Sequence, residues 1–237
     1  MRGALILVAG TGTDVGKTHV ADALVRHASR RLAIGGFKPV ESGVVGSTGS
    51  DGARLAAASN VAGSMFHVKH PAAPYLFRRA VSPHLAARDE GVRIELGPIC
   101  SAVDELRGSV DHVLVELAGG LFSPLAPGLL NIDLATALAP TRVILVALDR
   151  LGVLHDVGAT TRAAGSALGA PLGIVLNAPP HPDASTGTNA AELALVTRAP
   201  LIATVPRADV ELLADGPDLA ALFAWSFGSL ADRRSAR

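Results

Sequence analysis

The chain has few of the features that mark exported, membrane-anchored or nucleic-acid-binding proteins. It contains one cysteine, Cys100, so no internal disulfide can form, and the apolar residues around that thiol favour an inert role in a reducing compartment. Lys plus Arg equal Asp plus Glu at 21 each, which provides no bulk field for nucleic acid or an anionic membrane. The first apolar run, residues 4–9, is too short to span a bilayer. We therefore expect a cytoplasmic protein that binds neither nucleic acid nor a membrane.

The composition supplies enough apolar material for one large core. Hydrophobic residues make up 49% of the chain and charged residues only 18%, as in a well-buried globular enzyme. A length of 237 residues suits one large α/β domain and does not require two. We expect a single domain over residues 1–237, allowing for a disordered tail over residues 229–237.

Short apolar runs alternate with stretches of helical periodicity, a pattern typical of a parallel sheet covered by helices. The predicted strands span residues 5–9, 36–40, 112–116, 142–148, 172–177 and 201–205. The predicted helices span residues 17–31, 153–168, 189–199 and 210–227. Residues 42–50 and 178–187 are predicted loops, and residues 65–83 fit no pattern. The expected fold class is α/β, with a doubly wound, mostly parallel sheet flanked by helices and ligands beyond the carboxyl ends of its strands.

The strongest functional signal follows the first predicted strand, where residues 10–18 read Gly-Thr-Gly-Thr-Asp-Val-Gly-Lys-Thr. A strand, a turn of small residues and a helix start aim backbone N–H groups and the positive end of the helix dipole at bound phosphate. Lys17 would reach the outer phosphates, and the Thr18 hydroxyl would bind Mg²⁺. Five residues rather than the usual four separate Gly10 from Gly16, so a chance Gly/Thr-rich turn has to be weighed. Because Gly-Lys-Thr lies between a predicted strand and a predicted helix, a P-loop NTPase-like fold is favoured over a chance Gly/Thr-rich turn.

Three charged residues elsewhere are candidates for the chemistry. Glu116 ends an apolar strand and is soon followed by Gly119 and Gly120, where a ligand can approach the backbone, so we expect it to bind Mg²⁺ or to activate a nucleophile. Asp51 stands at an apparent helix start, and the sequence leaves ordinary capping and metal binding equally open. Lys38 sits inside an otherwise apolar strand end, just before a Gly/Ser turn, which favours contact with an anion over a snorkelling edge lysine.

Together these segments resemble the dethiobiotin synthetase family, the ATP-dependent ligases of biotin synthesis. The resemblance runs through most of the chain, and the phosphate loop, with its extra residue, is its most specific part. The shared segments are Gly-Thr-x-Thr-x-Val-Gly-Lys-Thr at residues 10–18, Lys-Pro-Val-x-Ser-Gly at 38–43, Ser-Asp at 50–51, Ser-Pro-His at 82–84, Val-Glu-x-Ala-Gly-Gly at 115–120, Leu-Gly at 151–152, and Asn177.

The resemblance implies a reaction in three steps. Carbon dioxide adds to one amine of 7,8-diaminononanoate, the resulting carbamate takes the γ-phosphoryl group of ATP, and the second amine attacks the mixed anhydride to close the urea ring of dethiobiotin. ATP is then a co-substrate, Mg²⁺ a cofactor, and a homodimer the implied assembly. No covalent protein nucleophile is needed, since phosphoryl transfer depends mostly on positioning and charge neutralisation.

The resemblance also implies roles for individual residues. The catalytic residues would be Lys38, Lys17 and Thr13, with Lys38 on the carbamate or the developing phosphoryl charge. Thr18, Asp51 and Glu116 would bind Mg²⁺. The substrate would contact Thr13, Lys38, Ser42, Gly119, Gly120 and His155. The nucleotide would contact Gly10, Thr11, Asp14, Val15, Gly16, Lys17, Thr18, His19, Asp51, Glu116, Gly119, Asn177, Pro206, Arg207 and Ala208, with Asn177 at the adenine.

The chain departs from the family pattern near the strand-end glutamate and in the segment after Leu-Gly. Leu117 stands where the family has glycine, and His155 replaces an asparagine. A tyrosine that the family often directs at the substrate carboxylate from the neighbouring subunit is not evident around residues 192–193. We expect Leu117 to have a negative φ and a side chain in apolar surroundings, leaving the amides of residues 118–120 to face the ligand.

The alternative function is a P-loop switch ATPase of the partitioning or septum-placing type, whose output is dimerisation or membrane binding. Such proteins carry a signature lysine early in the phosphate loop, where this chain has Gly12. A GTPase is disfavoured because no Lys-x-Asp that could read guanine follows Asn177. Phosphate release that requires the diamine and bicarbonate would separate the ligase from every switch.

Overall fold

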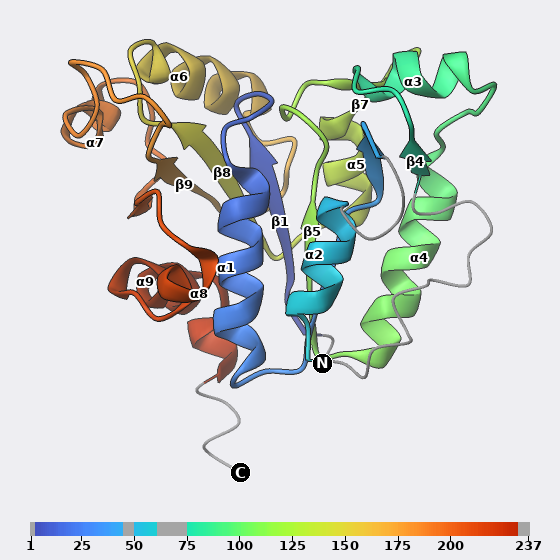
Figure 1. The fold of residues 1–237 in the computed structure, drawn as a ribbon, viewed down its shortest axis with the longest axis horizontal. Coiled ribbons are helices and arrows are strands. Elements are labelled where there is room, and N and C mark those ends of the chain that lie inside the picture. Colours follow the sequence, from blue (N-terminus) through green and yellow to red (C-terminus); the bar gives the residue numbers. More distant parts are fainter. Residues whose placement is uncertain (1–2, 45–49, 61–74, 232–237) are drawn as a thin grey trace.

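The computed structural model describes residues 3–44, 50–60 and 75–231, which form a central parallel sheet between two layers of helices (Figure 1). All neighbouring strands of this sheet run parallel, in the order β10-β9-β8-β1-β5-β2. The strands are β1 (Leu5–Gly10), β2 (Ile34–Phe37), β5 (His112–Glu116), β8 (Arg142–Leu148), β9 (Leu172–Asn177) and β10 (Leu201–Val205). The predicted α/β class with a doubly wound parallel sheet is confirmed.

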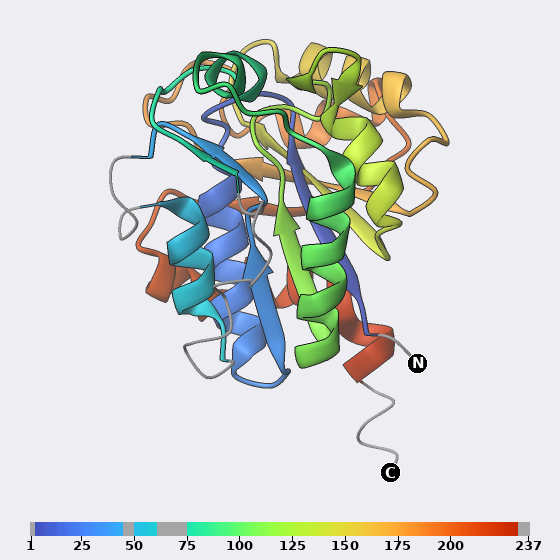
Figure 2. The ribbon, with the colours of Figure 1, turned by 90° about the vertical axis from the view of Figure 1, so that its right-hand side faces the viewer.

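Helices cover both faces because successive strand residues point to opposite sides and both sides are apolar. Leu5 and Leu7 of β1 pack on one face, in a core with α4 (Leu96–Ser109) and α5 (Asn131–Leu138). Ile6 and Val8 pack on the other face, in a core with α1 (Lys17–Ser29), α2 (Asp51–Ala58), α8 (Val210–Ala214) and α9 (Pro217–Ala231). Figure 2 shows α1 and α2 on the opposite side of the sheet from α4.

Shorter elements gather at the end of the sheet where β1 leads into α1 (Figure 1). β3 (Val40–Ser42) pairs in parallel with β4 (Tyr75–Phe77), and β6 (Pro124–Ala126) pairs antiparallel with β7 (Leu129–Leu130). The helices at this end are α3 (Pro83–Asp89), α6 (Val153–Ala164) and α7 (Asn189–Glu192), which continues into a 3₁₀ turn, η1 (Leu193–Leu195). This is the carboxyl end of the strands, where ligands of open α/β sheets bind.

Four predicted strands coincide with β5, β8, β9 and β10, whereas three other predicted elements are wrong in part. The strand expected over residues 36–40 is interrupted at Lys38 and Pro39 between β2 and β3, since proline cannot donate to a strand ladder. The helix expected over residues 189–199 is only α7 and η1. The helix expected over residues 210–227 is two helices, because Pro217 starts α9 and cannot extend α8.

Several predicted segments fall partly outside the described residues. Residues 229–231 of the expected tail belong to α9, and residues 232–237 are not described. Residues 45–49 of the expected loop and residues 65–74 of the unassigned segment are likewise outside the described residues. Among the helices that the structure describes, none is long and apolar enough to cross a membrane.

Candidate active site

The phosphate loop joins β1 to α1 through backbone conformations that most side chains avoid. Gly16 has a φ of 88°, and a Cβ atom there would lie 1.9 Å from Asn177 Nδ2, so only glycine fits. Asp14 also has a positive φ, 57°, which is rare for a residue other than glycine. Within the described chain no side chain caps the N-terminus of α1, and its first turn holds no acidic residue. The backbone N–H groups at this helix end are therefore free of a competing carboxylate and suited to an anion.

Lys17 begins α1 and folds back over the loop, where its Nζ donates to the Gly12 carbonyl at 2.9 Å. Its side chain is buried, and burial lowers the pKa of the Lys17 ammonium despite the nearby Glu116 carboxylate. Among the described residues the hydrogen-bond partner of this buried ammonium is a neutral carbonyl, which phosphate oxygens could replace with a stronger, charge-assisted contact. This fits the expected role of Lys17 at the outer phosphates.

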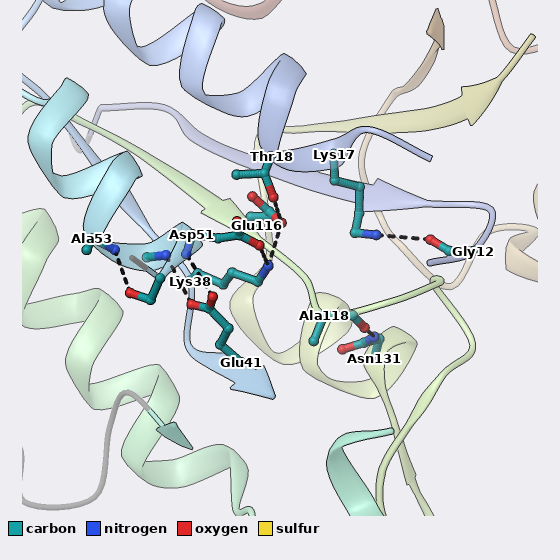
Figure 3. Close-up of polar contacts among 12 residues, drawn as sticks. Gly12, Lys17, Thr18, Lys38, Glu41, Asp51, Ala53, Glu116, Ala118 and Asn131 are labelled. Carbon is teal, nitrogen blue, oxygen red and sulfur yellow. Dashed lines mark hydrogen bonds and ion pairs between the residues drawn. The ribbon is translucent and has the colours of Figure 1, made fainter. Parts of the chain in front are cut away.

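Four polar side chains from different elements meet beside this loop (Figure 3). Thr18 Oγ1, in the first turn of α1, donates to Glu116 Oε1 at the end of β5 over 2.8 Å. Lys38 Nζ, between β2 and β3, lies 2.9 Å from Glu116 Oε1 and 2.5 Å from Asp51 Oδ2. The sequence brings them together because the parallel strands β1, β5 and β2 end at the same edge.

The charges in this cluster depend on one another. Burial alone would lower the pKa of the Lys38 ammonium, but Glu116 and Asp51 raise it on balance, so Lys38 stays charged. Burial raises the pKa of the Glu116 carboxyl even with Lys38 in contact, because Glu116 has no solvent exposure. Burial also works to raise the pKa of Asp51, but Lys38 outweighs it and lowers that pKa. In this cluster the Lys38 ammonium is paired with both carboxylates. A divalent cation bound at the same oxygens would further stabilise the ionised form of Glu116 and Asp51.

The residues fit a hard divalent cation such as Mg²⁺. Glu116 Oε2 is buried and has no hydrogen-bond partner among the described residues, although carboxylate oxygens are seldom left unpaired in a protein interior. The Thr18 hydroxyl and the Asp51 carboxylate supply two more oxygen ligands beside it. The described residues contain no group of three His, Cys, Asp or Glu side chains placed to hold a metal. Mg²⁺ does not need one, since it typically takes one or two carboxylates and completes its shell with phosphate and water.

A cavity of about 710 Å³ opens over the loop and the cluster. It brings together most of the side chains expected to touch substrate. The residues that were predicted as site residues and that line the cavity are Thr13, Asp14, Gly16, Lys17, Thr18, His19, Lys38, Ser42, Asp51, Glu116 and Gly119. The other expected contacts do not line it: Gly10, Thr11, Val15, Gly120, His155, Asn177, Pro206, Arg207 and Ala208.

Some of these residues contact the phosphate loop or the cavity lining from behind. Asn177 Nδ2 donates to the Val15 carbonyl at 3.2 Å, while Asn177 Oδ1 is buried and finds no hydrogen-bond partner in the part of the chain that the structure describes. The ring of His19, which lines the cavity, interacts with the backbone of Pro206. Gly120 packs against the backbone of the phosphate loop. His155 is exposed on α6, does not line the cavity and has no such contact among the described residues.

Three further residues that no sequence pattern marked as functional shape this cavity. Glu41 and Ser123 line it, and Asn131 is fully buried behind it. Asn131 Nδ2 donates to the carbonyls of Ala118 and Gly120 at 2.5 and 2.9 Å, which fixes the turn after β5. Glu41 was visible as the variable position of the Lys-Pro-Val-x-Ser-Gly segment, whereas Ser123 and Asn131 lie outside every motif.

Two conformational expectations can be checked directly. Leu117 has no solvent exposure, packs in the apolar core, does not line the cavity and is not among the residues with positive φ, so the geometry expected for Leu117 itself is confirmed. The ligand-facing amide expected at Gly120 is wrong, because the Gly120 N–H donates to Ser123 Oγ at 2.9 Å. Ser50, not Asp51, provides the side-chain cap of α2, by accepting from Ala53 N at 3.0 Å. The Asp51 carboxylate is directed at Lys38 instead, which removes ordinary capping as its explanation.

Most of the sequence is similar to a family model and to several known enzymes. A family model described as an AAA domain matches residues 5–210. ATP-dependent dethiobiotin synthetases from Rhodopirellula baltica and Anaeromyxobacter dehalogenans are 37% and 39% identical to this chain. The alignments cover 85% of this chain and 84% of the first relative, and 87% and 90% for the second. The enzyme of Ralstonia nicotianae is 36% identical over 92% of this chain and 96% of its own length.

Solved structures with the same fold are much more distant in sequence. A ParA family ATPase from Chlorobium tepidum superposes with a TM-score of 0.55 at 11% identity, covering 97% of this chain and 98% of its own. A MinC:MinD cell division complex from Aquifex aeolicus gives 0.53 at 12% identity, covering 99% of this chain and 96% of that one. At identities this low, the superpositions are evidence for a shared P-loop fold and carry no information about function.

Proposed function

The chain belongs to the ATP-dependent dethiobiotin synthetase family, and we propose that it converts 7,8-diaminononanoate, carbon dioxide and ATP into dethiobiotin, ADP and phosphate. The observation that carries the proposal is the meeting of Lys38 with Thr18, Asp51 and Glu116 beside a phosphate loop. A nucleotide-binding loop alone would suit any P-loop protein. The added buried ammonium, next to oxygen ligands and inside a cavity, suits phosphoryl transfer to a small anionic acceptor.

In this proposal the loop holds ATP. The amides of residues 14–18 and the Lys17 ammonium bind its phosphates, and the unpaired Asn177 Oδ1 accepts from the adenine amino group. Pro206, Arg207 and Ala208 would lie along the base, consistent with the interaction of the Pro206 backbone with His19 of the cavity lining. Thr18, Asp51 and Glu116 would hold Mg²⁺, which neutralises charge on the outer phosphates when bound.

The diamine would occupy the part of the cavity lined by Thr13, Ser42 and Gly119, with Lys38 between it and the nucleotide. One amine adds to carbon dioxide and loses a proton, giving a carbamate. A carbamate oxygen then attacks the γ-phosphorus and ADP leaves, while the Lys38 ammonium stabilises the charge that develops on the transferring group. The second amine attacks the carbamate carbon, the C–O bond to phosphate breaks, and inorganic phosphate leaves as the urea ring closes.

A homodimer and a cytoplasmic location belong to the same proposal. His155 is exposed and outside the cavity lining, so it can contact the substrate only where the substrate extends beyond the cavity or where a second copy of the chain brings it there. We keep His155 as a proposed contact for the carboxylate end of the substrate, on the basis of its place in the family segment.

Coupling of phosphate release to the diamine tests the proposed function against a switch ATPase. The purified protein should release phosphate from ATP and Mg²⁺ only when diaminononanoate and bicarbonate are both present. Phosphate release that ignores both compounds, or that responds to vesicles or DNA, would favour the switch. No observation in the structure favours the switch, because its likeness to partitioning ATPases is a likeness of fold.

A further inference from the structure

Glu41 has no part in the roles described so far, yet its carboxylate holds the backbone that carries Asp51. Glu41 lies in β3, lines the cavity and is only 7% exposed. Its Oε1 accepts from the backbone N–H of Asp51 at 2.7 Å, and its Oε2 accepts from that of Gly52 at 3.1 Å (Figure 3). Both carboxylate oxygens are therefore bound to the first turn of α2.

These amides need an acceptor from outside the helix. The first N–H groups of an α-helix have no partner within it, and their partial positive charge favours a nearby carboxylate. In α2 the amides of Asp51 and Gly52 go to Glu41, and that of Ala53 goes to the Ser50 hydroxyl at 3.0 Å. Glu41 thus binds more of these amides than Ser50 does, although eight residues separate Glu41 from Ser50 in the sequence.

The contact has a consequence for the carboxylate of Asp51. Holding the Asp51 amide fixes the Cα position from which its side chain reaches Lys38, and Lys38 in turn contacts Glu116. Gly52 packs against Lys38 and Glu41, so the helix start, the lysine and the capping acid form one packed unit. The Glu41 carboxylate also lies at the positive end of the α2 dipole, where a negative group is favoured.

We propose that Glu41 is a positioning residue, which fixes the first turn of α2 so that Asp51 faces the divalent cation site. The inference rests on the proposed function only in taking Asp51 as a metal ligand. Residues that orient a metal ligand from behind commonly change metal affinity by about 10- to 100-fold when they are replaced. Glu41 acts here through the backbone rather than through the ligand's own side chain.

The test compares variants that weaken the same helix end in different ways. Glu41→Gln keeps the size of the side chain but replaces one acceptor oxygen with an amino group, and Glu41→Ala removes both acceptors. Ser50→Ala is the matched control, because it removes the cap of Ala53 and leaves the amides of Asp51 and Gly52 bound. For each full-length variant, ADP affinity is measured by calorimetry across a Mg²⁺ titration, together with the unfolding temperature and the KM for the diamine.

In both Glu41 variants, the Mg²⁺ concentration that gives half of the Mg²⁺-dependent gain in ADP affinity should rise by about tenfold or more. Ser50→Ala should leave that requirement unchanged while losing thermal stability. Equal Mg²⁺ requirements in the wild type and the Glu41 variants, or an equal rise in Ser50→Ala, would overturn the proposal. A raised KM for the diamine at an unchanged Mg²⁺ requirement would also overturn it, since Glu41 would then face the amine. Failure of the proposed function would appear separately, as wild-type protein that makes no dethiobiotin.

Discussion

Lys38 Nζ lies 2.9 Å from Oε1 of the fully buried Glu116, and the same ammonium contacts Asp51 Oδ2 at 2.5 Å. One lysine therefore occupies oxygens of both carboxylates proposed to bind Mg²⁺. An isolated buried carboxylate would be costly, so Lys38 stabilises the site while the metal is absent. Binding of Mg²⁺ with ATP would take over that neutralisation and leave the ammonium for the transferring group.

Replacing Lys38 should separate chemistry from nucleotide binding. In Lys38→Gln the charge on the transferring group is lost, which should cost about 3 kcal/mol or more in the transition state and nearly abolish urea formation. Affinity for ADP with Mg²⁺ should remain close to that of the wild type, because the loop and the carboxylates are intact. Single-turnover product formation and calorimetry give the two quantities. Equal losses of binding and turnover would place Lys38 outside the reaction centre.

Neutral versions of the two carboxylates should alter the response to metal. Glu116→Gln and Asp51→Asn each remove a charged oxygen ligand, so each should raise the Mg²⁺ concentration needed for half activity. Glu116→Gln should have the larger effect, since its Oε2 is buried and unpaired and the metal is its only proposed partner. Rates measured across a Mg²⁺ titration decide the point. If Asp51→Asn changes only the unfolding temperature, Asp51 has a structural role.

Two glycines of the phosphate loop should differ in how well they tolerate substitution by alanine. Gly16→Ala forces a side chain into a positive φ, at about 1–2 kcal/mol, and drives its Cβ into Asn177. It should lower the unfolding free energy and weaken ATP binding. Gly12→Ala is the control, because nothing lies within 4 Å of a Cβ at Gly12. Denaturant unfolding and ATP titration of both variants are the measurements. Equal tolerance of the two substitutions would contradict the described loop conformation.

Leu117 should matter for stability and not for chemistry. Its side chain is buried in the apolar core, so Leu117→Gly should cost about 2 kcal/mol or more in unfolding free energy, with little change in turnover of the folded enzyme. Leu125→Ala, at another fully buried position of the same core, provides a reference for simple loss of apolar contact. A change of diamine preference in Leu117→Gly, without loss of stability, would show that Leu117 shapes the substrate pocket.

The sequence predicted the elements whose patterns depend on burial. Runs rich in Val, Ile and Leu located β5, β8 and β9, because strands covered on both faces are largely apolar. The edge strand β10 was located from its apolar residues although Thr204 is exposed. The loop at residues 10–18 was visible because phosphate binding restricts residue type and order together. The helix predicted over residues 210–227 failed because apolar spacing continues across Pro217, where the backbone cannot continue the helix.

Contacts between distant segments were beyond the sequence patterns. Asp51 could be a cap or a ligand until the structure showed that Ser50 caps α2 and that Asp51 meets Lys38. Asn131 and Glu41 act by binding backbone groups far along the chain, which leaves no local spacing to detect. These roles depend on tertiary placement and become visible only when the chain is folded.

The mass of the product tests the central claim most directly. The protein is incubated with 7,8-diaminononanoate, ATP, Mg²⁺ and ¹³C-labelled bicarbonate, and the mixture is analysed by mass spectrometry with phosphate measured in parallel. We predict dethiobiotin carrying one labelled carbon, formed in equal amount to the phosphate released and absent when the diamine, ATP or bicarbonate is omitted. Phosphate released without labelled dethiobiotin would contradict the assignment of this chain as a dethiobiotin-forming ligase.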